Sequence, residues 1–163
     1  MRDIIQLVDL FADLLRRRGV AIQRVNNASR LKTFEERLSK RLPLSFTSWL
    51  SRYSFESFDI EGISFFAWNS EENLYVAEAS APKNSLAELL LPCGFVQIGR
   101  PDTGDFDAVC FDSNASVRNR EYPLVRIDHE EILCNQKVRI LGALWPSFIK
   151  MMESALSRDD GVK

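Results

Sequence analysis

The spacing of apolar residues over the first part of the chain predicts helices. Apolar side chains recur there at intervals of three and four, the repeat that places them on one helix face. Asp3 is placed to cap the first helix, and Gly19 to end it after Arg16-Arg17-Arg18, since cations favour the negative end of a helix and glycine tolerates positive φ. The stripe consists of Ile4, Leu7, Val8, Phe11, Leu14 and Leu15.

Two further helices are predicted before residue 54. Ser29 is placed to cap a helix that ends before Leu42-Pro43, because the residue preceding proline is forced out of the helical region. A third helix follows with an aromatic stripe, which is typical of a surface that faces the core. Residues 20–28 fit either a short strand or a loop. The two apolar stripes are Leu31, Phe34 and Leu38, and then Phe46, Trp49, Leu50 and Tyr53.

From Phe58 the period changes to two, which is typical of half-buried strands. Glu61-Gly62 separates the first two strands as a turn or a bulge. Residues 74–79 fit either element, and Ser85 is placed to cap a short helix over 86–91. The predicted strands cover Phe58 to Ile60, Ile63 to Trp68, Phe95 to Ile98, Phe106 to Phe111, Tyr122 to Ile127 and, at an edge, Val138 to Leu141.

Helical signals return near the end of the sequence. Asp128, with Glu131 three residues later, is typical of a capping box for a short helical turn. The last helix is predicted to begin near Trp145-Pro146, since proline is tolerated in a first turn, and residues 159–163 to form a frayed tail. Helices first, strands in the middle and a closing helix predict an α+β fold around one antiparallel sheet, as a single domain over residues 1–158.

Length and composition agree with this prediction. The chain has 163 residues, the size of one domain, and its 45% hydrophobic and 27% charged residues are usual for a soluble globular protein. No apolar run approaches the ~20 residues of a membrane helix, and no secretory leader is read, so a cytoplasmic location without membrane partners is expected. Three widely spaced cysteines and one histidine do not supply zinc-ligand spacing, so no metal or other cofactor is expected.

Charge is distributed unevenly along the chain. Residues 1–41 hold ten Lys/Arg and five Asp/Glu, whereas residues 54–113 hold two basic and eleven acidic residues. The acidic region is either an interaction surface or a solvated sheet face without a partner. The basic triplet 16–18 has a structural explanation at a helix end, and the acidic strands would repel phosphates, so nucleic acid is not an expected partner.

Three sets of motifs follow one another along the chain: Leu42-Pro43 with Phe46, Trp49-Leu50 and Tyr53; Gly94 through Ile98-Gly99 with Gly104-Asp105 and Asp112; and Pro123 to Glu130 with Ser147-Phe148. In this order they resemble the SUKH superfamily of bacterial toxin-immunity proteins and a fungal cell-wall assembly regulator. One departure is Ser54-Phe55, where members often carry a glycine-containing turn. The resemblance implies a twisted sheet flanked by helices, with the C-terminal helix packed on it, and a role in binding proteins.

This resemblance leads us to expect a non-catalytic immunity protein that binds and neutralises a toxin domain. A nuclease-like toxin exposes a basic surface, and an acidic partner gains association rate and specificity from charge complementarity. Trp68 is either an apolar anchor of that interface or a core residue. The candidate partner-binding residues are Asp59, Glu61, Trp68, Glu71, Glu72, Asp102, Asp105 and Asp107.

Two alternatives stay open. The first is a divalent-metal-dependent enzyme centred on Asp102, Asp105, Asp107 and His129, since hard cations prefer clustered carboxylate oxygens. The same segment also fits a plain turn, because aspartate accepts local backbone N–H groups and glycine takes positive φ. The second is an intracellular regulatory scaffold, which only the fungal branch of the resemblance suggests.

Overall fold

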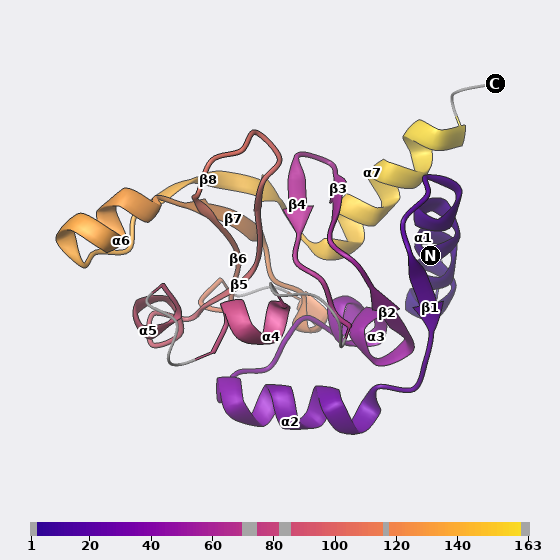
Figure 1. Ribbon diagram of the computed structural model, residues 1–163, viewed down its shortest axis with the longest axis horizontal. Coiled ribbons are helices and arrows are strands. Elements are labelled where there is room, and N and C mark those ends of the chain that lie inside the picture. Colours follow the sequence, from indigo (N-terminus) through magenta and orange to yellow (C-terminus); the bar gives the residue numbers. More distant parts are fainter. Residues whose placement is uncertain (1–2, 70–74, 82–85, 116–117, 161–163) are drawn as a thin grey trace.

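The computed structural model describes residues 3–69, 75–81, 86–115 and 118–160, and these residues form an α+β fold (Figure 1). Their main sheet is antiparallel throughout, and each strand pairs with the next one along the chain. The order across this sheet is β3 (Phe58–Ile60), β4 (Ile63–Phe65), β5 (Phe95–Pro101), β6 (Ala108–Asp112), β7 (Leu124–Ile127) and β8 (Ile140–Trp145). A smaller sheet pairs β1 (Ile22–Arg24) with β2 (Tyr53–Phe55).

Several helices contribute side chains to the larger hydrophobic core, and three of them pack together on one face of the main sheet. These three are α1 (Ile4–Arg17), α3 (Leu44–Arg52) and α7 (Phe148–Asp160). The ring of Phe148 packs against Phe46, Phe65 and Phe111, so α7 is fixed to both α3 and the sheet. The predicted α+β class, with the C-terminal helix packed on the sheet, is therefore confirmed.

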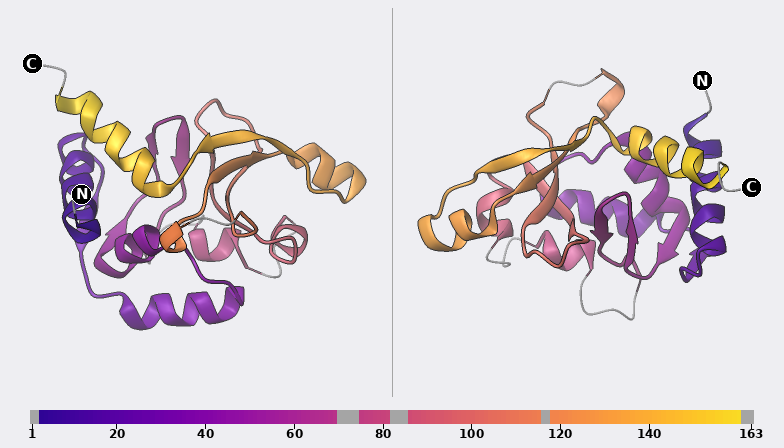
Figure 2. Two further views of the ribbon diagram at one scale, coloured as in Figure 1. Left: turned by 180° about the vertical axis from the view of Figure 1, so that it is seen from behind. Right: turned by 90° about the horizontal axis from the view of Figure 1, so that it is seen from above.

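A smaller core lies on the opposite sheet face, because the strand residues that form it alternate with those of the larger core. Two short helices cover it, α5 (Ala87–Leu90) through Leu90 and α6 (His129–Asn135) through Ile132. α6 and α1 lie at opposite ends of the fold (Figure 2). The remaining helical segments are α2 (Ala28–Leu38), α4 (Val76–Ala79) and the 3-10 turn η1 (Arg118–Arg120). None of the described helices is long and apolar enough to cross a membrane.

The limits of α1 follow its sequence signals. The Asp3 carboxylate accepts a hydrogen bond from the Ile5 N–H (3.4 Å), and Gly19 follows the helix with φ +83°. The start of α2 differs from the prediction, since Ser29 lies inside the helix. Asn27 occupies the N-cap position instead, and the side chain of Asn26 accepts a hydrogen bond from the Ala28 N–H (3.3 Å).

Tyr53 marks a second difference, because it begins β2 and does not extend α3. Its backbone is extended (φ −132°, ψ 142°) and pairs with Arg24 of β1. The Tyr53 hydroxyl donates a hydrogen bond to Asp9 (2.8 Å) on α1. The apolar repeat of α3 thus extends to Tyr53, but pairing with β1 makes this residue part of a strand.

Several strand limits also differ from the prediction: β4 ends earlier, at Phe65, β5 continues to Pro101, and β7 begins later, at Leu124. β6 begins at Ala108, which leaves Phe106 in the preceding loop, and β8 covers Ile140–Trp145, further along the chain than the predicted edge strand. The Glu61-Gly62 turn of the β3–β4 hairpin is confirmed, with φ +52° and +81° at these two residues. Positive φ at both positions matches the twist of a two-residue hairpin. Ser85 lies outside the described residues.

The last helix begins later and ends later than predicted. Pro146 follows β8, and Ser147 caps α7 by accepting a hydrogen bond from the Lys150 N–H (3.2 Å). The helix includes Asp159, which was expected in the frayed tail. Arg17 donates a hydrogen bond to the Asp159 carboxylate (2.8 Å), and this ion pair fixes the end of α7 to α1.

Candidate protein-binding surface

The loop that joins β5 to β6 carries the acidic cluster predicted from the sequence. It covers residues 102–107 and lies beside the turn of the β3–β4 hairpin, where the Asp102 N–H donates to the Gly62 carbonyl oxygen (3.2 Å) (Figure 1). Gly104 has φ +84°, and the Thr103 hydroxyl donates to the Asp105 carboxylate (2.7 Å). These contacts confirm the expectation that this segment forms a turn.

Asp107 fixes the end of this loop to two other elements. Its Oδ2 accepts a hydrogen bond from Arg126 Nε on β7 (2.6 Å), and its Oδ1 lies 2.7 Å from His129 Nδ1 at the start of α6. Arg126 Nη2 also donates to the Asp105 carboxylate (3.0 Å). Burial alone would raise the pKa of Asp107, but the hydrogen bonds from His129 and Arg126 outweigh it and lower the net pKa. The hydrogen bond with Asp107 in turn raises the pKa of Arg126.

Phe106 projects from this anchored loop. Its side chain is 61% exposed, the largest exposure among the large hydrophobic residues described. Its ring centroid lies 6.0 Å from that of His129 and 5.3 Å from the guanidinium carbon of Arg100. Because both neighbours stand on regular elements, the exposed ring is held between fixed groups. We call Arg100, Asp102, Asp105, Phe106 and His129 the loop surface.

Arg100 differs from Arg126 in its partners. Its guanidinium carbon lies near two phenyl rings, 5.7 Å from the ring centroid of Phe66 and 5.3 Å from that of Phe106. Across the part of the chain that the structure describes, no carboxylate forms an ion pair with it, and its buried Nε has no hydrogen-bond partner. Arg100 is therefore a positioned cation without a counter-charge.

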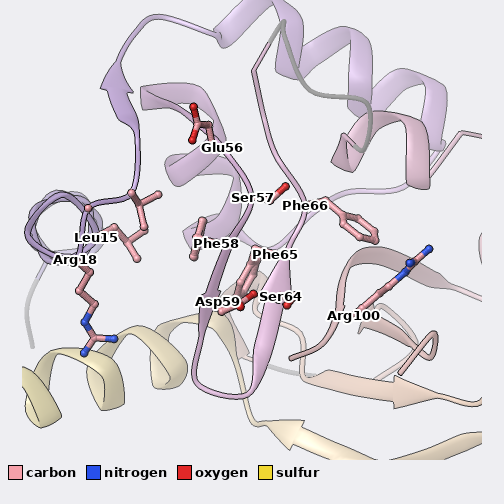
Figure 3. Close-up of a pocket in the computed structure, with 12 residues that line it drawn as sticks. Leu15, Arg18, Glu56, Ser57, Phe58, Asp59, Ser64, Phe65, Phe66 and Arg100 are labelled. Atoms are coloured by element: carbon pink, nitrogen blue, oxygen red, sulfur yellow. Dashed lines mark hydrogen bonds between the residues drawn. The ribbon is translucent and has the colours of Figure 1, made fainter. Parts of the chain in front are cut away.

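A groove of about 570 Å³ runs from Arg100 across the β3–β4 hairpin towards the end of α1. Figure 3 shows Arg100 and Phe66 at one end, Arg18 at the other, and Asp59 with Ser64 between them on neighbouring strands. The Ser64 hydroxyl donates a hydrogen bond to the Asp59 carboxylate, so this central pair is satisfied internally. The groove thus has a cation at each end, and Phe65 and Phe66 among its lining residues.

The residues of the metal-enzyme alternative meet only in part. Asp107, Asp128 and His129 offer ligand atoms within 4.8 Å of one another, whereas Asp102 is not in this group. Both oxygens of Asp107 already accept hydrogen bonds, and Asp128 caps α6 by accepting from two backbone N–H groups. The arrangement is complete as a network of protein groups.

Three candidate partner-binding residues are buried within the fold, which corrects the expectation that they form an exposed interface. Trp68 is fully buried and its indole N–H donates to the Leu50 carbonyl oxygen (2.9 Å). Glu61 has a side chain only 3% exposed and accepts a hydrogen bond from Ser154 on α7 (3.1 Å). Asp107 is buried against Arg126 and His129.

The other candidates divide between exposed and undescribed positions. Asp59 and Asp102 are exposed, and Asp105 is exposed although it binds Arg126. Glu71 and Glu72 lie outside the described residues. The structure therefore brings Asp102 and Asp105 together on the loop surface and places Asp59 in the adjacent groove.

A second exposed apolar feature is the edge strand β8. Ile140, Leu141 and Leu144 are 47%, 45% and 37% exposed, and among the described residues the strand pairs only with β7. Two register shifts interrupt that pairing. Such bulges twist an edge away from further strand addition, a common protection of open sheet edges. The exposed apolar side chains of β8 nevertheless make this strand the alternative to the loop surface as a contact region.

Sequence reasoning missed the two residues that distinguish the loop surface. Phe106 was assigned to a strand, although it is the lone apolar residue in the stretch Asp102 to Asp107. Arg100 is one of only two basic residues between Ser54 and Ser113. An apolar residue inside a turn and a cation inside an acidic region are the signals that would have identified them.

No protein-family model and no curated protein sequence matches this chain.

Proposed function

We propose that this chain is a non-catalytic protein-binding domain whose contact region is the loop surface. The observation that carries the proposal is Phe106, a 61% exposed aromatic ring on a loop that Asp107 ties to β7 and α6. Large aromatic residues on rigid supports are frequent anchors of protein interfaces, since they bury much area at little cost in conformational entropy.

The charge around Phe106 indicates the kind of partner. Asp102 and Asp105 precede the ring in the same loop and are exposed, and Asp59 lies in the neighbouring groove. A partner with an apolar pocket rimmed by lysine or arginine complements this arrangement. Together with the resemblance to the SUKH superfamily, this supports a cytoplasmic immunity protein that neutralises a toxin domain with a basic surface.

Partner capture with matched variants tests the proposal. Tagged wild-type protein, Phe106→Ser and Leu44→Ser are incubated with lysate of the native organism; Leu44 is the control because it is 40% exposed on α3, outside the loop surface. We expect one stoichiometric partner with wild type and Leu44→Ser, and loss of that partner with Phe106→Ser. Full retention by Phe106→Ser, or equal loss with both variants, would contradict the proposed surface.

The immunity role needs a second readout. The captured partner is expressed alone and together with this chain in a host cell. We expect growth arrest with the partner alone and recovery when wild-type protein, but not Phe106→Ser, is present. A harmless partner that binds through the same surface would instead support the regulatory scaffold.

A further inference from the structure

The surroundings of Arg100 point to a ligand group that the described part of the chain does not supply. The guanidinium carbon of Arg100 lies 5.7 Å from the ring centroid of Phe66 and 5.3 Å from that of Phe106. The rings attract the cation, but they offer no conventional acceptor for its N–H groups. The Arg100 Nε is buried and has no hydrogen-bond partner among the described residues. A buried donor without an acceptor costs free energy, so an acceptor at this place would stabilise the arrangement.

Two of the three carboxylates of this loop, and Asp59 in the groove, already have partners, whereas the third loop carboxylate, Asp102, is exposed and forms no ion pair with Arg100 among the described residues. Asp105 and Asp107 both bind Arg126, at 3.0 and 2.6 Å, and Asp59 accepts a hydrogen bond from Ser64. The fold therefore places two arginines near one acidic loop, and two of its carboxylates pair with Arg126 while none pairs with Arg100. Arg100 is left with aromatic neighbours and an opening into the groove that it lines.

We propose that Arg100 binds the side-chain carboxylate of an aspartate or glutamate on the partner protein, beside the site where Phe106 inserts. This inference rests on the proposed protein-binding function. It adds a contact in which this chain supplies the positive charge and the partner the negative one. A planar guanidinium forms paired N–H···O bonds with a carboxylate.

The groove favours a protein carboxylate over a free phosphate. Glu56 and Asp59 also line it, and their charges oppose an anion that carries more than one negative charge. A carboxylate side chain on a polypeptide carries a single charge. The neutral N–H groups of that polypeptide can donate hydrogen bonds to Glu56 and Asp59. The partner thus presents a basic rim to the loop and one acidic side chain to Arg100.

Arginine side-chain NMR tests this without the partner. The Nε–H signals of Arg100 and Arg126 are followed while a capped Gly-Glu-Gly peptide is added, with capped Gly-Gln-Gly, acetate and inorganic phosphate as parallel probes. We expect the Arg100 signal to shift in a saturable manner at millimolar glutamate peptide. Arg126, bound by two carboxylates, stays unshifted and serves as the internal control.

Three outcomes would overturn the inference. They are an unmoved Arg100 signal, an equal shift with the glutamine peptide, and tighter binding of phosphate than of the glutamate peptide. Shifts with both acetate and the glutamate peptide support the carboxylate class, and a larger effect of the peptide supports a polypeptide source. Arg100→Lys keeps the charge but loses the paired geometry, and we expect no saturable shift of the backbone amide signals next to position 100 when the glutamate peptide is added to this variant.

The captured partner separates this inference from the proposed function. Arg100→Lys is expected to weaken partner affinity at least tenfold, about 1.4 kcal/mol. Arg24→Lys is the matched control, because Arg24 is exposed on β1, outside the loop surface. If Phe106→Ser abolishes binding while Arg100→Lys leaves it unchanged, the protein-binding function stands and the inference about Arg100 falls. If no partner is captured, the peptide titration still decides the inference.

Discussion

Arg126 and Arg100 stand beside the same acidic loop and have opposite surroundings. Arg126 is held by Asp107 and Asp105, one of them buried, so its charge is balanced inside the protein. Arg100 is held by the rings of Phe66 and Phe106 and has no carboxylate partner among the described residues. The difference separates two uses of one side chain. A paired arginine fixes the loop, whereas an unpaired but positioned arginine keeps its hydrogen-bonding capacity for a partner.

The largest expected loss of stability comes from removing the paired arginine, Arg126. Arg126→Ala leaves the buried Asp107 carboxylate without its cation, and we expect the free energy of unfolding to fall by about 3 kcal/mol. Arg100→Ala removes only ring contacts and is expected to cost less than about 1 kcal/mol. Urea unfolding of both variants measures the difference. Equal losses would mean that both arginines are structural.

A slightly smaller effect is expected from Gly99→Ala, which disturbs the strand that carries Arg100. A Cβ at Gly99 would collide with the backbone carbonyl oxygen of Ser64 on the paired strand β4. Forcing the strands apart should cost about 2 kcal/mol and should also broaden the Arg100 Nε–H signal in NMR spectra. As a control, Gly142→Ala in β8 adds a Cβ in open space and should leave that signal sharp. An unchanged stability in Gly99→Ala would show that the close approach of β4 and β5 is not needed.

The dependence of the free energy of unfolding on acid pH tests the role of Asp107. Its pKa is lower in the folded protein than in an ordinary aspartate, so the stabilisation is fully present above the unfolded pKa, about 4, and is lost as the pH falls through the lower folded pKa. Urea unfolding between neutral pH and pH below this value should show a steeper acid loss for wild type than for Asp107→Asn. Parallel profiles would mean that Asp107 contributes no pH-dependent stability.

The smallest effect on stability is expected at the exposed ring. Phe106→Ser removes a side chain that lies mostly in water, so the free energy of unfolding should change by less than about 0.5 kcal/mol. Its effect on partner capture should nevertheless be the largest of these variants. A thermal unfolding scan run beside the capture experiment checks that lost binding does not reflect lost folding.

Local signals predicted much of the fold. Asp3 and Gly19 limit α1 as expected, Glu61-Gly62 turns the first hairpin, and Asp128 caps α6. These features depend on contacts between residues close in sequence, which the pattern of residue types records. The α+β class followed from the same local pattern of helices, strands and a closing helix.

Features that depend on distant residues could not be predicted. The N-terminus of α3 follows Pro43 without a local side-chain cap, and Glu121, 76 residues further on, accepts hydrogen bonds from the Ser45 N–H (2.8 Å) and hydroxyl (2.7 Å). Burial raises the pKa of Glu121 in spite of these bonds. No local sequence pattern predicts this contact between Glu121 and Ser45.

The candidate site was predicted in part for the same reason. Charge patterning identified the acidic loop and its exposed Asp102 and Asp105. It did not show that Asp107 is bound by Arg126 and His129, or that Glu61 lies beneath α7. Burial and pairing decide which carboxylates remain available, and both arise from the packing of elements that are far apart in the sequence.

Site-specific photocrosslinking in the native cell tests the central claim most directly. The photoreactive residue p-benzoylphenylalanine replaces Phe106 on the loop surface, Leu141 on the edge strand β8, or Leu44 on α3, and covalent adducts are identified by mass spectrometry. We predict one dominant protein adduct at position 106 and none at position 44. An adduct at position 141 without one at position 106 would contradict the account and assign the contact to the edge strand.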